Sequence, residues 1–232
     1  MGNFKYGHEV PNDYKDVVRL DEAADTNQWH EAIAKEIAAL LHHGCFDFKQ
    51  AGYKPPRDYQ RAPLKMVYDV KPDGRFKARL VVQGCCIDSR GLSTRATVVK
   101  SVSVRTLDII AELFGLGAKT GDIGNAFIQA LTNEKCYIEC GPEFGSKAGL
   151  IAIIRKALYG LTTYAERLRT LLADFLRSLG FVPTRFDRDM WMRLRKEDDG
   201  YDDVFTHVDD FKIVARNLDR WLERIKATFL VK

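Results

Sequence analysis

The stretch VFTHVDDFKIV, residues 204–214, places two adjacent aspartates between two short apolar runs. Both runs are rich in β-branched and aromatic residues, so they predict a strand pair whose tip carries Asp209 and Asp210. Charges at such a tip are costly to desolvate unless a metal ion or a cationic group neutralises them. Aspartate is also common in exposed tight turns, so the pair alone leaves a metal site and a plain turn equally open.

A third acid favours the metal site. Asp122 ends a predicted short strand and is followed by Gly124 and Ala126, which leave room for a ligand near the backbone. Magnesium binds through carboxylates and substrate phosphates, and three convergent aspartates suit that task. Two other aspartate pairs lie in KEDDGYDD, residues 196–203, which we expect to be an acidic solvated loop.

Composition excludes several classes of protein. The 232 residues are 46% hydrophobic without a long biased run, so the chain can bury a core. It has no uninterrupted apolar stretch of the roughly 18 residues that a membrane helix needs, so we expect no membrane partner and a chain inside the cell. The five cysteines are expected to be free thiols. A formal net charge of +4 is compatible with a polyanionic partner without requiring one.

Periodicity predicts the remaining elements. Helices are expected near residues 29–41, 102–114, 164–179 and 217–229, and strands near residues 64–70, 76–82, 135–140, 150–154, 190–194, 204–208 and 211–214. The first helix follows a capping cluster at residues 25–27, and the second is expected to be capped by Ser101 or Ser103. Strands and helices do not alternate strictly, which favours an α+β fold with an antiparallel or mixed sheet and helices packed on one face.

One predicted hairpin has two chemically different faces. Its strands, residues 64–70 and 76–82, are joined by the turn KPDG. In the second strand a period of two puts Phe76, Ala78, Leu80 and Val82 on an apolar face and Arg75, Lys77 and Arg79 on the opposite, cationic one.

Six short motifs occur in one order along the chain. They are Trp29 with Ala32 and Glu36, then KARLV at 77–81, GDIGNAF at 121–127, GPEFG at 141–145, ALYGL at 157–161 and VDD at 208–210. In this order they resemble the reverse transcriptase of copia-type long-terminal-repeat retrotransposons from about Phe4 to Ala215. The resemblance implies a polymerase palm and fingers, in which Asp122, Asp209 and Asp210 are the catalytic, metal-binding aspartates.

The resemblance implies further roles. The reaction would be RNA-directed DNA synthesis, in which a primer 3′-hydroxyl attacks the α-phosphate of a dNTP with the help of two Mg²⁺ ions, or of Mn²⁺. Phe127 resembles an aromatic filter against a ribose 2′-hydroxyl, with plain core packing as the alternative. Lys77 and Arg79 resemble residues that hold the triphosphate, with a solvated strand face as the alternative.

His207, Tyr159 and Gly160 are implied as contacts to the primer or to an RNA or DNA template. Two departures concern this set. His207 stands where relatives have tyrosine, and Thr162-Thr163 stands where many carry Lys-Gln.

The resemblance also implies a domain organisation: fingers over residues 29–100, palm over 101–216, and the start of a truncated thumb or a C-terminal helix over 217–232. We expect the thumb, ribonuclease H and integrase segments of a polyprotein to be missing. The alternatives are an active fragment, a catalytically silent remnant that binds nucleic acid, and a scaffold for protein interaction. The expected location is the cytoplasm, including virus-like particles, with the nucleus as an alternative.

Overall fold

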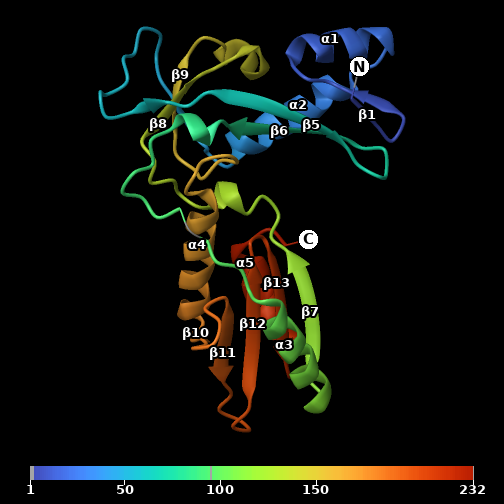
Figure 1. Ribbon diagram of the computed structural model, residues 1–232, viewed down its shortest axis with the longest axis vertical. Coiled ribbons are helices and arrows are strands. Elements are labelled where there is room, and N and C mark those ends of the chain that lie inside the picture. The colour runs from blue at the N-terminus through green and yellow to red at the C-terminus, as the bar shows by residue number, and fades with distance from the viewer. Residues whose placement is uncertain (1–2, 95, 232) are drawn as a thin grey trace. The chain divides into compact units, whose positions relative to one another are not determined.

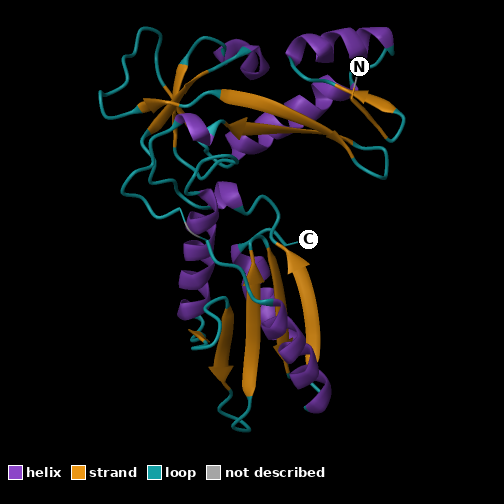
Figure 2. Ribbon diagram, in the orientation of Figure 1, coloured by secondary structure: helices purple, strands orange, loops and turns teal. Residues whose placement is uncertain are grey.

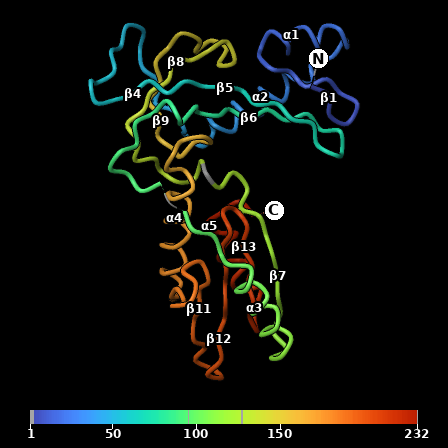
Figure 3. The backbone as a smooth tube through the Cα atoms, in the orientation of Figure 1, coloured from blue at the N-terminus to red at the C-terminus, as the bar shows by residue number. Residues whose placement is uncertain are grey.

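The computed structural model describes residues 3–94 and 96–231, with the exception of the side chain of Phe127. The chain forms two compact units, each built from two separate segments of the sequence (Figures 1 and 3). The first contains Met1–Leu92 and Leu131–Tyr164, and the second contains Ser93–Ala130 and Ala165–Lys232. The boundaries of fingers and palm expected from the sequence stay a prediction. None of the described helices combines the length and the apolarity that crossing a bilayer requires.

The first unit holds short sheets around one long helix (Figure 2). Its elements are β1 (Asn3–Lys5), β2 (His8–Val10), α1 (Tyr14–Ala23), α2 (Gln28–His42), β3 (Phe46–Phe48), β4 (Gln60–Arg61), β5 (Leu64–Val70), β6 (Phe76–Val82), the 3-10 helices η1 (Gly84–Cys86) and η3 (Pro142–Lys147), β8 (Cys136–Glu139) and β9 (Ile151–Ile154). Strands β3, β9, β8 and β4 form a mixed sheet, because β4 pairs with β8 in parallel.

The β5–β6 hairpin confirms the expected strands and their two faces. Leu64 pairs with Val82 and Val70 with Phe76, so the bounds and the turn are as predicted. Helix α2 packs on the apolar face, where the Trp29 ring meets the Phe76 ring edge-on with centroids 4.5 Å apart. This packing stabilises the hairpin and leaves the cationic face turned away from α2.

The start of α2 differs from the prediction. Asn27 precedes the helix but makes no capping bond with its side chain. Instead the buried carboxylate of Asp21, from α1, accepts the backbone N–H groups of Trp29 at 3.2 Å and His30 at 3.0 Å. A capping acid from another helix satisfies the free N–H groups and also ties α1 to α2.

The second unit is a five-stranded antiparallel sheet in the order β10-β11-β12-β13-β7. Its elements are α3 (Ser101–Leu113), β7 (Gly117–Asp122), the 3-10 helix η2 (Phe127–Gln129), α4 (Tyr164–Ser178), β10 (Val182–Pro183), β11 (Met190–Leu194), β12 (Tyr201–His207), β13 (Asp210–Ala215) and α5 (Leu218–Thr228). Together with the first unit it confirms the α+β class.

Helices cover both faces of this sheet, which corrects the expectation of helices on one face. Leu107 and Ala111 of α3 join Phe205 in one buried cluster. The strand alternation sends Val204 to the opposite face, where it lies with residues of α4 and α5. Figure 1 shows α3 in front of the sheet and α5 behind it.

Two more local expectations were wrong. Helix α3 is preceded by Lys100 and has no serine cap; the carboxylate of Asp187 accepts the Lys100 N–H at 2.8 Å and the Ser103 hydroxyl at 2.5 Å. The predicted acidic loop is partly a strand, since Asp202 and Asp203 are buried inside β12. Both differences arise from contacts between residues distant in sequence.

Candidate active site

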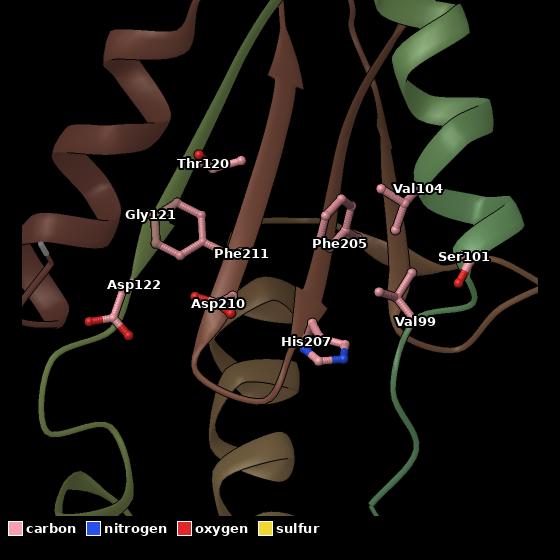
Figure 4. A pocket seen from close by; sticks show the side chains of 10 residues that line it. All are labelled: Val99, Ser101, Val104, Thr120, Gly121, Asp122, Phe205, His207, Asp210 and Phe211. Atoms are coloured by element: carbon pink, nitrogen blue, oxygen red, sulfur yellow. The ribbon is translucent and has the colours of Figure 1, made fainter. Parts of the chain in front are cut away.

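The end of β7 and the β12–β13 turn bring three carboxylates together. Asp210 pairs directly with Asp122 across the two strands, and the Ile123 N–H donates to the Asp209 carbonyl at 2.8 Å. One oxygen from each of the three aspartates can be chosen so that all lie within 4.8 Å of one another. Figure 4 shows Asp122 and Asp210 on adjacent strands at the same edge of the cavity.

A two-residue turn makes this convergence possible. Adjacent strand residues point to opposite faces, so Asp209 and Asp210 could not both face Asp122 within a straight strand. His207 pairs with Asp210, which leaves Val208 and Asp209 as the turn. Val208 has φ 59, a conformation unusual for a β-branched residue. Such backbone costs of order 1–3 kcal/mol, so the surrounding hairpin holds this turn against its local preference.

The three carboxylates repel one another. Partial desolvation and the negative charges of Asp209 and Asp122 raise the pKa of Asp210, and His207 partly offsets them. Among the residues that the structure describes, no lysine or arginine lies within salt-bridge distance of the three. An all-oxygen donor set without a cationic partner matches the preference of hard divalent ions, so the residues present fit Mg²⁺ or Mn²⁺.

A cavity of about 590 Å³ opens beside the aspartates on the face covered by α3. Asp122, Asp210 and His207 lie at one end, and Phe205 and Val104 supply an apolar wall (Figure 4). An apolar wall with a few convergent polar groups is typical of ligand-binding sites, and the negative edge of this one favours a cation at the carboxylates.

Two buried aspartates fix the position of the segment that forms one wall of this cavity. They were not predicted from the sequence. Asp189 accepts from the Arg169 guanidinium at 2.6 Å and from the Thr97 hydroxyl, while Asp187 caps α3. Both acids are buried; Thr97 lies just before the segment 99–104 that lines the cavity, and Ser103 lies within it. A signal was present in the sequence FDRDM, residues 186–190, where two acids stand directly before a predicted strand and between Phe186 and Met190.

The other predicted residues lie in the first unit, apart from His207 and Phe127. The Arg79 guanidinium lies 4.6 Å from the centroid of the Tyr159 ring. Lys77 lies on the same strand, and both cations lower the pKa of Glu36, although burial dominates and raises it. The side chain of Phe127 lies outside the described residues; its backbone belongs to η2.

The backbone conformation at position 160 and its close contact with Val82 both require glycine. Its φ is 89, and a Cβ there would lie 1.9 Å from the Val82 carbonyl oxygen. The Val82 N–H also donates to the Tyr159 carbonyl at 2.7 Å. The next two residues are engaged as well, since the carboxylate of the buried Glu134 accepts the Thr163 N–H at 2.8 Å and the Thr162 hydroxyl at 3.3 Å.

Comparison with known proteins identifies the class. Residues 52–231 match the family described as reverse transcriptase (RNA-dependent DNA polymerase). The chain therefore belongs to the reverse transcriptase family, as the motif order indicated.

The relatives come from plant retrotransposons. The chain is 26% identical over 217 residues to the retrovirus-related Pol polyprotein from transposon TNT 1-94 of Nicotiana tabacum, covering 89% of this chain and 16% of the relative. It is 28% identical over 225 residues to that from transposon RE1 of Arabidopsis thaliana, covering 91% and 15%. The chain thus spans about one sixth of the length of these relatives.

Among solved structures, a foamy viral protease-reverse transcriptase dRH in complex with double-stranded DNA matches with a TM-score of 0.46 and 14% identity. The match covers 87% of this chain and 30% of that one.

Proposed function

We propose that this chain is the RNA-directed DNA polymerase domain of a retrotransposon polyprotein, and that it transfers nucleotides from dNTPs to a primer 3′-hydroxyl. The observation that carries the proposal is the convergence of Asp122, Asp209 and Asp210 beside a cavity, with no lysine or arginine of the described part of the chain within salt-bridge distance of them. Membership of the reverse transcriptase family supports it.

The three aspartates would hold two Mg²⁺ ions, or Mn²⁺. When bound, such ions stabilise the attacking and the leaving oxygens of an in-line displacement. The fixed pairing of Asp210 with Asp122 supplies the positioning, because both carboxylates are set by one hydrogen-bonded register. His207, at the same edge of the cavity, would seat the primer end against the apolar wall.

Residues of the first unit would grip the substrates. Lys77 and Arg79 are proposed to contact the triphosphate. Stacking on Tyr159 uses the face of the Arg79 guanidinium and leaves its N–H edge for phosphate oxygens. Phe127 is proposed as the sugar filter, and Tyr159 and Gly160 as contacts to the template or primer.

One observation favours a second candidate, a catalytically silent domain that binds nucleic acid. Thr162 and Thr163, which replace the Lys-Gln pair of many relatives, turn their polar groups toward Glu134. Threonines engaged in this way have fewer hydrogen-bond donors and no charge for a template strand, compared with a lysine and a glutamine. Binding of the template would therefore be weaker even with the three carboxylates intact.

Primer extension tests the proposal. The chain is assayed on poly(rA) with an oligo(dT) primer, in Mg²⁺ and in Mn²⁺, beside Asp122→Asn and Asp209→Asn. We expect extension by the parent and none by either variant. Asp199→Asn is the matched control: Asp199 is exposed, has φ 53 and tolerates asparagine, so this variant should extend normally.

Thermal unfolding separates loss of chemistry from loss of fold. Removing one of three mutually repelling charges should leave Asp122→Asn at least as stable as the parent, while Mg²⁺ should stabilise the parent alone. A folded parent that binds template without extending the primer would support the second candidate. Extension by Asp209→Asn at the parental rate would refute the metal assignment.

A further inference from the structure

Two adjacent cysteines occupy an exposed turn that the proposed polymerase chemistry does not use. Cys85 and Cys86 lie in η1, directly after β6, and both are exposed. Their sulfur atoms are 3.8 Å apart. The other three cysteines, Cys45, Cys136 and Cys140, are buried.

The spacing of the two sulfurs suits a shared soft ligand. Tetrahedral zinc, with metal–sulfur bonds of about 2.3 Å, holds two sulfurs about 3.8 Å apart, so the observed 3.8 Å is in the range that a bridging thiophilic centre needs. The pair is poorly placed for a disulfide, because consecutive Cα atoms are about 3.8 Å apart whereas disulfides span about 4.4–6.8 Å. The two thiols therefore remain available as a reduced pair.

The turn that carries them is held at both ends. The Gln83 N–H donates to the Pro63 carbonyl at 2.8 Å, and the Gln60 side chain makes two bonds with the backbone of Asp88, at 2.7 and 2.9 Å. Gly84 packs so closely on Gly160 that a Cβ would lie 2.0 Å from the Gly160 oxygen. A turn fixed in this way loses little conformational entropy when a ligand bridges its sulfurs.

We propose that Cys85 and Cys86 form a chelating dithiol site for a soft, thiophilic centre that takes two thiolates at once, of the class of trivalent arsenicals and Cd²⁺. A trivalent organoarsenical is the closest match, since its own carbon substituent and two sulfurs complete its coordination. In the reaction with phenylarsine oxide, two S–H bonds and the arsenic–oxygen bond break and two arsenic–sulfur bonds form. The protons leave with the oxygen as water, and arsenic stays trivalent.

The environment separates this pair from the other thiols. Cys85 and Cys86 are exposed, although the hydrogen bond and the charge of Cys85 raise the pKa of Cys86. The other three thiols are buried, and burial raises the pKa of Cys45 and Cys136 to about 12 and that of Cys140 to about 11. Buried thiols with so little thiolate are poor ligands and nucleophiles.

A ligand bound to Cys85 and Cys86 should also disturb the cationic face of β6. This second step rests on the proposed function. The dithiol turn contacts Gly160, and the neighbouring Tyr159 stacks on Arg79. A ligand that shifts η1 would therefore disturb the residue proposed to grip the triphosphate, so we expect it to inhibit primer extension.

Intact-mass spectrometry tests the site without any need for activity. The full chain is treated with phenylarsine oxide, then with excess 2-mercaptoethanol or with 2,3-dimercaptopropanol. We expect one phenylarsenic group per chain that survives the monothiol and is removed by the dithiol. Cys85→Ser and Cys86→Ser should each bind roughly 100-fold more weakly, because the chelate is lost, and the double variant should bind none. Cys140→Ala should behave as the parent.

Each result has a definite meaning. Uptake by the double variant equal to that of the parent, or two groups per chain that the monothiol removes, would overturn the proposal. A cadmium–thiolate absorption band in the parent and not in the double variant shows that the pair also takes a metal ion; arsenical uptake without that band restricts the site to arsenicals. Arsenical bound without inhibition refutes only the second step, and absence of extension in the untreated parent concerns the proposed function alone.

Discussion

Asp203 should lower the stability of the protein at neutral pH. The residue lies inside β12 and is 4% exposed, and among the described residues its carboxylate makes no hydrogen bond. Burial and the neighbouring charge of Asp202 raise the pKa of the Asp203 carboxyl to about 6, and Arg195 offsets them only in part. The folded protein therefore holds this proton more tightly than the unfolded chain does.

The sign and the size of the effect follow from linkage. Since the folded pKa is the higher one, the free energy of unfolding falls as pH rises from about 4 through about 6, and the loss is complete above that. A shift of about two pH units corresponds to a penalty of about 3 kcal/mol at pH 8. We expect Asp203→Asn to remove this penalty, so the variant should be more stable than the parent at pH 8 and equal to it near pH 4.

Urea denaturation of parent and variant between pH 4 and pH 8 measures the difference. Asp202→Asn is the matched control from the same strand: Asp202 accepts from the Trp221 indole at 3.1 Å and pairs with Arg195 at 3.3 Å, so its loss should destabilise the protein. If Asp203→Asn were less stable than the parent at pH 8, or if the difference did not change with pH, the assignment of an unpaired buried carboxylate would be refuted.

Two further predictions concern the interior of each unit. Asp189→Asn leaves the Arg169 guanidinium without its charge partner at 2.6 Å and should lower the free energy of unfolding by about 2–3 kcal/mol. The loss is smaller than for a fully buried pair because the Arg169 side chain is 29% exposed. An unchanged midpoint in urea denaturation would contradict this. Gly160→Ala should abolish the native packing, since the new Cβ would collide with the Val82 carbonyl oxygen. Gly74 also has a positive φ, but no atom lies within 4 Å of the position of its Cβ. Gly74→Ala should therefore lower the free energy of unfolding, measured by thermal unfolding, by only about 1–2 kcal/mol. Equal losses in the two alanine variants would refute the collision.

Elements governed by local periodicity were predictable. The β5–β6 hairpin has the predicted bounds because its alternation and its turn residues agree. Helix α5 begins at Leu218 with the expected cap, since the Asn217 side chain accepts the Arg220 N–H at 3.1 Å. In both cases the determining contacts join residues close in sequence.

Features that depend on distant contacts were not predictable. Asp21 caps α2, and Asp187, which lies 84 residues from Ser103, caps α3. Each replaces a nearer residue that local rules favoured, because a buried carboxylate must find donors and a helix N-terminus offers free N–H groups. Without knowing which elements pack together, a sequence reader has no means of choosing the distant acid.

The aspartate pairs show how backbone geometry decides the use of identical residues. Within β12 the period of two sends Asp202 to one face and Asp203 to the other. Among the described residues, the Asp202 carboxylate accepts from the Trp221 indole and pairs with Arg195, whereas the Asp203 carboxylate makes no hydrogen bond. Asp209 and Asp210 escape this separation because the turn at Val208 interrupts the strand. Both can then converge with Asp122, and the charge repulsion that results is what a divalent cation would relieve. The apolar flanks of a pair therefore indicate a costly charge, but the turn determines whether that charge becomes a site.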